Sequence, residues 1–194
     1  MTKAERTRQF IIEQSAPVFN TKGIAGTAMS DIMEATKMAK GGLYGHFESK
    51  EELSYAVVDY SLDLLSKKVT TALNKYQTAK EKLFAYMDFF NQPECAIKGG
   101  CPMLNFGMEA DSTNPVINKK IKQDIIKSQQ FIAGIIKEGV ANQEFKPDMD
   151  ADGFAVKLFA LMEGGTMITN VIGDNSQMNN IIKMLRAEIE AQLT

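Results

Sequence analysis

The stretch AMSDIMEATKMAKGGLYGHF, residues 28–47, determines how this chain is interpreted. Its apolar residues are spaced for two helices of under three turns each. We expect the first over about residues 28–35, capped by Thr27, and the second to begin near Ala39, after a junction at residues 36–38. Neither helix buries enough surface to be stable alone, so both must pack against the helix before them. The outer face of the second helix should therefore remain exposed.

That outer face carries groups that suit contact with DNA. Lys37 and Lys40 place positive charge near its start, and Gly41 lets the backbone approach a phosphate or a base edge. Tyr44 and His46 add a hydroxyl and an imidazole at its end. A helix of this size fits the major groove, where base edges are distinguishable. The helix has no arginine, so we expect specificity from Lys40, from contact with thymine methyl groups and from DNA shape.

Residues outside this helix can support the same contact. Lys50 lies in the first turn of the next helix, beside amides that can bind phosphate. Arg6 and Arg8 are candidates for the DNA backbone or a minor groove. The lysines and His46 also have interpretations that do not involve DNA. The lysines can be ordinary solvated side chains, and His46, the only histidine, can be a hydrogen-bonded structural residue.

The segment resembles the DNA-binding domain of the TetR family of repressors. The matching motifs span roughly residues 5–60. They are FNTKG (19–23), GT (26–27), DI (31–32), KGGLY (40–44), HF (46–47) and SKEEL (49–53). The resemblance implies an all-helical homodimer in which three N-terminal helices bind DNA and the remainder holds a ligand cavity and the dimer interface. Pro17 departs from the common pattern and is expected to kink the first helix.

Carried over position by position, the resemblance also implies a set of DNA-contacting residues. They are Thr27, Lys37, Ala39, Lys40, Gly41, Tyr44, His46 and Lys50. A two-fold dimer implies a double-stranded, pseudo-palindromic operator with half-sites about one helical turn apart. The last two helices, from about Asp150 to Leu193, are the expected dimerisation element, and Gly164 and Gly165 within them indicate close helix–helix contact.

Periodicity predicts an all-α fold for the whole chain, because apolar residues recur at helical spacing almost throughout. We expect a helix-turn-helix DNA-binding domain at residues 1–47, with the family-type domain reaching about 60, and a helical ligand-binding and dimerisation domain at 48–194. Helix starts are predicted at Thr2, Ser49, Lys80, Pro102, Asn114-Pro115, Asp148 or Asp150, and Ser176.

Composition narrows the class of protein. The chain has 194 residues, 44% of them hydrophobic, which suffices for a core. Its net charge of −2 argues against a non-specific nucleic-acid coat. Residues 1–46 nevertheless carry six basic against four acidic side chains, or +2, so a basic N-terminal part precedes an acidic remainder. We expect no membrane-spanning run and no membrane partner, and a cytoplasmic location with the two cysteines, Cys95 and Cys101, reduced.

The methionines and aromatics of the second part suggest a cavity for a small, mostly apolar or cationic effector. The alternative for each is plain core packing. The candidate ligand-binding residues are Tyr86, Phe90, Cys101, Met103, Phe106, Phe131, Met162 and Glu163. Met108 and Met167 should also face inward, and Glu109 is a second candidate polar anchor.

Three functions follow from these residues. The first is a repressor that an effector releases from its operator. The second is an electrophile or oxidant sensor on the same scaffold, in which Cys101 at a helix start is the reactive thiol rather than a small buried hydrophobe. The third is a helical ligand-binding module that does not bind DNA. The chain shows no catalytic constellation, and neither a metal site nor a cofactor is expected from a single histidine and two cysteines without ligand-like spacing.

Overall fold

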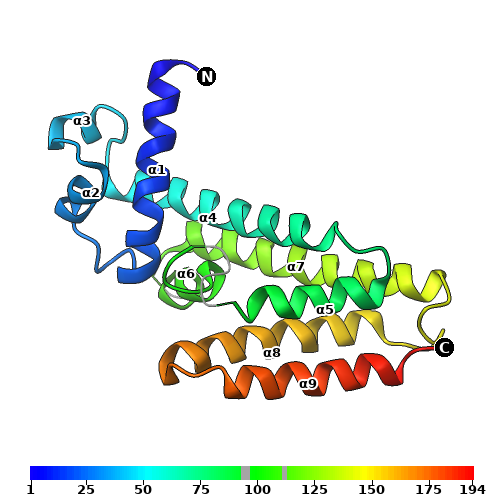
Figure 1. Ribbon diagram of the computed structural model, residues 1–194. Coiled ribbons are helices and arrows are strands. Elements are labelled where there is room, and N and C mark those ends of the chain that lie inside the picture. Colours follow the sequence, from blue (N-terminus) through cyan, green and yellow to red (C-terminus); the bar gives the residue numbers. More distant parts are fainter. Residues whose placement is uncertain (93–96, 111–112) are drawn as a thin grey trace. The chain divides into compact units, whose positions relative to one another are not determined.

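The computed structural model describes residues 1–92, 97–110 and 113–194, whose regular structure is helical (Figure 1). The helices are α1 (Lys3–Lys22), α2 (Met29–Thr36), α3 (Lys40–Tyr44), α4 (Lys50–Leu73), α5 (Ala79–Phe90), α6 (Pro102–Ala110), α7 (Pro115–Ala141), α8 (Ala151–Ile172) and α9 (Ser176–Ala191). The predicted all-α fold is confirmed. Cys95 lies outside the described residues.

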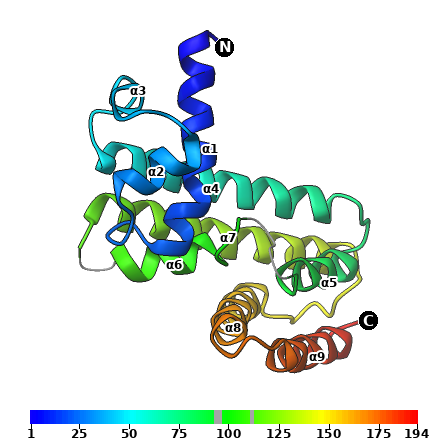
Figure 2. The same ribbon diagram turned by 60° about the vertical axis from the view of Figure 1, so that its left-hand side comes forward.

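The chain divides into two compact units. The first comprises Met1–Leu65 and Ala96–Lys122, and the second comprises Ser66–Cys95 and Gln123–Thr194. The long helices α4 and α7 each contribute residues to both units. The first unit therefore contains α1, α2, α3 and α6, whereas the second contains α5, α8 and α9 (Figures 1 and 2).

The first unit is built around α1. Ile11 and Phe19 on α1 are fully buried, as is Ile32 on α2, and Leu43 on α3 is 1% exposed. Both short helices thus bury an apolar side chain, as their length requires. Pro17 lies inside α1, and the helix continues through it to Lys22.

The second unit pairs α8 with α9 and packs both against α5 (Figure 1). Buried apolar side chains from all three helices form its core. They are Leu83, Met87, Leu158, Ile182, Leu185 and Ile189. Gly165 lies where the predicted close helix contact occurs, because a Cβ there would be 2.8 Å from the sulfur of Met178 on α9. Among the described residues, a Cβ placed on Gly164 would meet nothing within 4 Å beyond its chain neighbours and its own helix backbone, so this glycine is not part of that contact.

Capping residues explain most of the helix starts. Thr2 and Glu5 form the predicted capping box, and Asp150 accepts a hydrogen bond from the amide of Gly153 at the start of α8. The Oδ1 atom of Asn114 accepts one from Ile117 at the start of α7. These helix starts are confirmed.

Two predicted caps are wrong by one residue. The N-cap of α2 is Ala28 rather than Thr27, because Asp31 in the first turn accepts the Ala28 amide at 2.9 Å. The N-cap of α9 is Asn175 rather than Ser176. In both places the polar residue next to the cap has another hydrogen-bond partner.

The α8 helix has the length and composition of a membrane-spanning segment, with a mean hydropathy of 1.2 in its most apolar window. This corrects the expectation that the chain has no such run. Asp152, Lys157 and Glu163 interrupt the run when the sequence is read alone. Core helices of helical proteins meet the same criteria, and Leu158 and Met162 of α8 are buried.

Candidate DNA-binding surface

The turn between α2 and α3 is fixed by local hydrogen bonds. Lys37 ends α2 in the left-handed region at φ 57°, and the hydroxyl of Thr36 accepts the amide of Met38 at 3.3 Å. At the other end of α2, Asp31 forms an ion pair with Lys22 at 2.8 Å. This contact, followed by the hydrogen bond from the Ala28 amide, lowers the pKa of the Asp31 carboxyl. The two helices are thus held to each other and to the end of α1.

The face of α3 opposite the core is exposed, as the sequence predicts. Lys37, Ala39, Lys40 and Gly41 are all exposed, and Tyr44 is 42% exposed. The Lys40 ammonium lies 5.8 Å from the centre of the Tyr44 ring, so the two side chains share this face. In the part of the chain that the structure describes, a Cβ built on Gly41 would meet no atom within 4 Å other than its chain neighbours and the backbone of its own helix. The surface therefore presents two cations, an aromatic hydroxyl and bare backbone to solvent.

The end of α3 is fastened to α1 by Arg8. The Arg8 guanidinium donates a hydrogen bond to the backbone carbonyl of His46 and lies 3.9 Å from the centre of the Phe47 ring. It also pairs with Glu52 on α4, with 2.8 Å between Nη2 and Oε1. The contacts visible here therefore hold the end of α3 in place, while contact of Arg8 with DNA stays a prediction. His46 itself is half-buried, and Arg6 is exposed.

Two of the predicted contact residues hold the loop before α2. Thr27 is 1% exposed, and its hydroxyl donates a hydrogen bond to the carbonyl of Gly23. The Lys50 ammonium donates to the carbonyls of Ile24 and Thr27, at 2.8 and 2.9 Å. Their contact with DNA stays a prediction, while the contacts visible here position the loop. Sequence spacing alone does not show that a lysine at a helix start is directed at carbonyl groups.

The structure separates the predicted ligand-binding residues into two groups. Cys101, Met103 and Phe106 belong to the first unit, and each is at most 4% exposed. The second group belongs to the second unit and consists of Tyr86, Phe90, Phe131, Met162 and Glu163. Within it the rings of Tyr86 and Phe90 lie 4.8 Å apart, and Met162 is buried. Their role in ligand binding stays a prediction.

Three side chains expected to face inward are exposed. Phe131 on α7 is 40% exposed, Met108 on α6 is 76% exposed, and Met167 on α8 is 47% exposed. Each lies on a helix whose other side is buried, so the size and apolarity of the residue did not reveal its face. Glu109, expected as a polar anchor in a cavity, instead accepts hydrogen bonds from the amides of Ile24 and Ala25.

The Cys101 side chain is fully buried directly before α6, and its carbonyl accepts the amide of Asn105 at 3.0 Å. A buried thiol is inaccessible to an electrophile or oxidant in this conformation. The environment favours the alternative of a small buried hydrophobe.

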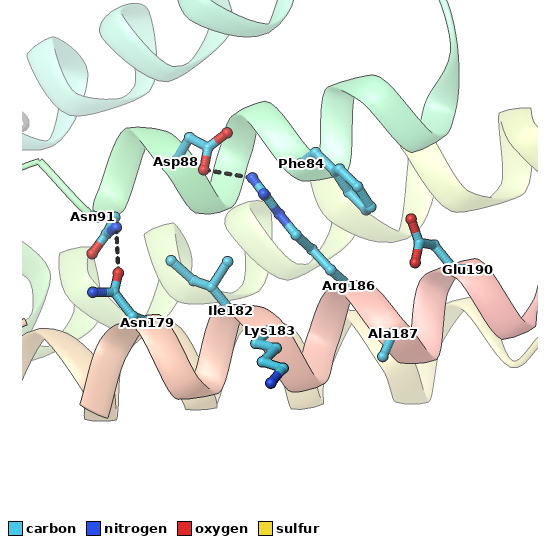
Figure 3. Close-up of a pocket in the computed structure, with 9 residues that line it drawn as sticks. All are labelled: Phe84, Asp88, Asn91, Asn179, Ile182, Lys183, Arg186, Ala187 and Glu190. Carbon is cyan, nitrogen blue, oxygen red and sulfur yellow. Dashed lines mark hydrogen bonds and ion pairs between the residues drawn. The ribbon is translucent and has the colours of Figure 1, made fainter. Parts of the chain in front are cut away.

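Sequence reasoning missed an open groove between α5 and α9, of about 570 Å³ (Figure 3). Arg186 crosses it to pair with Asp88 at 2.6 Å, and lies 4.7 Å from the centre of the Phe84 ring. At one end the side-chain amide of Asn91 donates a hydrogen bond to the Oδ1 atom of Asn179 at 3.0 Å. None of the predicted ligand-binding residues lines this groove. Most of the α9 residues that line it are polar or charged, so the sequence alone suggests a solvated face there.

Comparison with known proteins adds two family matches. Residues 11–57 match the model for bacterial regulatory proteins of the tetR family, and residues 79–185 match the model for the tetracyclin repressor-like C-terminal domain. The first match contains α2 and α3 with their exposed face. The second covers α5 through most of α9.

Two solved structures are similar over the whole chain. A TetR-family transcriptional regulator from Cytophaga hutchinsonii is 36% identical, with a TM-score of 0.94 over 100% of this chain and 98% of that one. A TetR transcriptional regulator from Chloroflexus aurantiacus J-10-FL is 34% identical, with a TM-score of 0.92 over the same shares. The HTH-type transcriptional repressor DhaR from Mycobacterium sp. strain GP1 is 26% identical over 150 residues, 75% of each chain.

Proposed function

Because this chain belongs to the TetR family of DNA-binding transcriptional repressors, we propose that it holds a pseudo-palindromic operator as a homodimer and is released by a small-molecule effector. Members of the family bind DNA operators and small molecules and are dimers. The observation that carries the proposal for this chain is the exposed face of α3, with Lys37, Lys40 and Tyr44 directed away from the core.

We assign operator reading to the exposed part of the predicted set. Lys40 is the group for a guanine edge or a phosphate, and Ala39 is placed for contact with a thymine methyl group. Gly41 lets the helix backbone lie close to the DNA, since no side chain intervenes. Lys37 and Tyr44 are assigned to hydrogen bonds with the DNA phosphates on either side of these base contacts. Thr27, His46 and Lys50 complete the proposed set at its edge, where we assign them to phosphate contacts.

The homodimer is assigned to α8 and α9. Val156, Met167 and Val171 on α8 are 49%, 47% and 78% exposed, and Met184 on α9 is 59% exposed. Exposed apolar side chains at helical spacing on paired helices favour an interface with another copy of the same surface. The bare surface at Gly164 permits close approach of a partner helix in the same region. The occupant we propose is a second copy of this chain.

We assign effector binding to the predicted ligand-binding and dimerisation domain, residues 48–194. The effector class proposed is the one expected from the sequence, a small, mostly apolar or cationic molecule. Buried aromatic and methionine side chains support this assignment in each unit taken by itself, on α6 in the first unit and on α5 and α8 in the second, because such linings adapt to apolar ligands. An effector that binds the DNA-free conformation more tightly lowers operator affinity by the same factor. We expect a DNA-binding protein of this kind to be located in the cytoplasm.

The proposal is tested by selecting duplexes from a random-sequence library with the full chain. A single enriched palindromic sequence is expected, and Lys40→Ala should lower affinity for it by about tenfold while changing affinity for random DNA less. Lys127→Ala is the matched control, since this exposed lysine lies on α7 in the second unit. Enrichment of no sequence would overturn the proposal and favour a ligand-binding module without DNA binding.

A further inference from the structure

The α6 helix lies outside the sequence motif that binds DNA, yet it grips the end of α1 and the loop that follows it. The Glu109 carboxylate accepts the amide of Ile24 at 2.7 Å through Oε2 and the amide of Ala25 at 2.6 Å through Oε1. Hydrogen bonds to an ionised carboxylate are about twice as strong as neutral ones. These two amides belong to the segment from which α2 and then α3 follow.

A second side chain of α6, one helical turn before Glu109, forms hydrogen bonds near the end of α1. The Asn105 amide donates to the carbonyl of Asn20 at 3.0 Å and to that of Gly99 at 2.9 Å. Because Asn105 and Glu109 are four residues apart, they project from one face of α6. Two successive turns of α6 are therefore hydrogen-bonded to this region, Asn105 to the end of α1 and Glu109 to the loop that follows it.

The loop is shaped to receive the carboxylate. Gly23 ends α1 at φ 76°, a conformation that favours glycine, and a Cβ on it would lie 3.0 Å from the Glu109 Oε2 atom. On its other side the loop offers the carbonyls of Ile24 and Thr27 to Lys50. A carboxylate thus binds the amides of this loop and an ammonium binds its carbonyls, so its conformation is fixed by opposite charges.

We propose that Glu109 is a positioning residue for DNA binding: it holds the loop between α1 and α2 in the conformation from which α3 meets the operator. The proposal deepens the function proposed above and rests on it. A neighbouring face of the same nine-residue helix buries Met103 and Phe106, two of the candidate ligand-binding residues. Displacement of α6 by an effector at those residues would withdraw the carboxylate from the loop and so lower operator affinity.

Removal of the Glu109 carboxylate has two expected effects on the affinity for DNA, and they are opposite in sign. Loss of a negative charge near bound DNA should tighten binding, because repulsion from the phosphates decreases. Loss of the clamp should weaken it. Glu109→Gln removes the charge and leaves one acceptor oxygen for two amides. Asp59→Asn is the matched control, because Asp59 is an exposed carboxylate of the same unit that pairs with Lys120 on α7.

The experiment measures affinity of the full-length variants for the selected duplex and for random DNA, at one salt concentration and well below each unfolding midpoint. Glu109→Gln should weaken binding to the selected duplex about tenfold, with little change for random DNA, whereas Asp59→Asn should leave the ratio unchanged. Glu109→Asp, which keeps the charge on a shorter side chain, should behave like Glu109→Gln. Hydrogen exchange should accelerate at the Ile24 and Ala25 amides in both Glu109 variants.

The outcomes separate this inference from the function on which it rests. If the wild-type chain enriches no duplex, the proposed function fails and the inference fails with it. If the wild type binds its selected duplex and Glu109→Gln binds as tightly as Asp59→Asn, only the inference is overturned. Faster hydrogen exchange at the Ile24 and Ala25 amides with unchanged affinity for the selected duplex would also overturn the inference. The loop would then be released from Glu109 with no effect on DNA binding.

Discussion

Arg8 on α1 and Glu52 on α4 form an ion pair, with 2.8 Å between Nη2 and Oε1. The same guanidinium donates to the His46 carbonyl and covers the Phe47 ring, and the second Glu52 oxygen accepts the amide of Glu48 at 2.7 Å. The pair therefore closes the segment between α3 and α4. Its contacts hold the end of α3, the helix proposed to contact DNA, against α1 and α4.

The first prediction concerns this pair and stability. Arg8→Ala should lower the free energy of unfolding by about 1–2 kcal/mol, because a hydrogen bond and a cation–π contact are lost together. Urea unfolding monitored by circular dichroism measures the change. Arg6→Ala is the control, since Arg6 is exposed on the same helix. Equal effects of the two substitutions would show that Arg8 does not position α3.

The second prediction concerns pH. Hydrogen bonds from the Glu48 amide, and then from Arg8, lower the pKa of the Glu52 carboxyl, and Lys22 lowers that of Asp31. A carboxyl whose pKa is lower in the folded state contributes stability above its unfolded pKa and loses it as the pH falls through the folded one.

Acid should therefore loosen the DNA-binding helices below about pH 4, the ordinary range of these carboxyl groups. In Glu52→Gln the dependence of stability on pH in this window should be shallower than in the wild type. Unfolding midpoints measured between about pH 3 and pH 6 test this. Identical slopes for the two proteins would contradict the assigned pKa shift.

The third prediction separates folding from DNA binding at Gly41. Among the described residues, a methyl group there meets no atom within 4 Å beyond its chain neighbours and the backbone of its own helix, so Gly41→Ala should stabilise the chain by up to about 1 kcal/mol through its higher helix propensity. The same methyl group lies on the exposed face and should weaken binding to the selected duplex about tenfold. Gly134→Ala is the matched control, because Gly134 on α7 is equally open. Unimpaired DNA binding by Gly41→Ala would mean that this face does not approach DNA.

The fourth prediction concerns assembly. Met167→Glu places a charge in the proposed interface on α8 and should convert dimer to monomer at micromolar concentration, as measured by sedimentation. Met108→Glu on α6 is the control, since Met108 is 76% exposed and lies outside α8 and α9. A dimer that survives Met167→Glu and dissociates with Met108→Glu would place the interface elsewhere.

Sequence reasoning recovered the features that short-range physics determines. The α2–α3 segment was found from residue spacing, and caps such as Asp150 and Asn114 were found from the preference of short polar side chains for helix starts. The exposure of Lys40 followed because a helix of five residues has few positions that can face the core. For these elements the neighbouring residues carry the information.

Features that depend on distant residues were missed. Glu109 lies 85 residues from Ile24, and nothing in either local sequence indicates their hydrogen bond. Arg8 was interpreted by its charge, and its contacts with Glu52 on α4 and with the His46 carbonyl could not be predicted from the residues around it. Phe131 was assigned inward by its size, yet the face it occupies depends on how α7 packs. The groove between α5 and α9 likewise exists only because two helices meet.

The central claim, that α3 of a dimer enters the major groove, is tested most directly by hydroxyl-radical and base-methylation footprinting of the full chain on its selected duplex. We predict two protected patches on one face of the DNA, with centres about one helical turn apart and related by a two-fold axis. Lys40→Ala should lose major-groove protection in both patches together. A single patch, or protection unchanged by Lys40→Ala, would contradict the account.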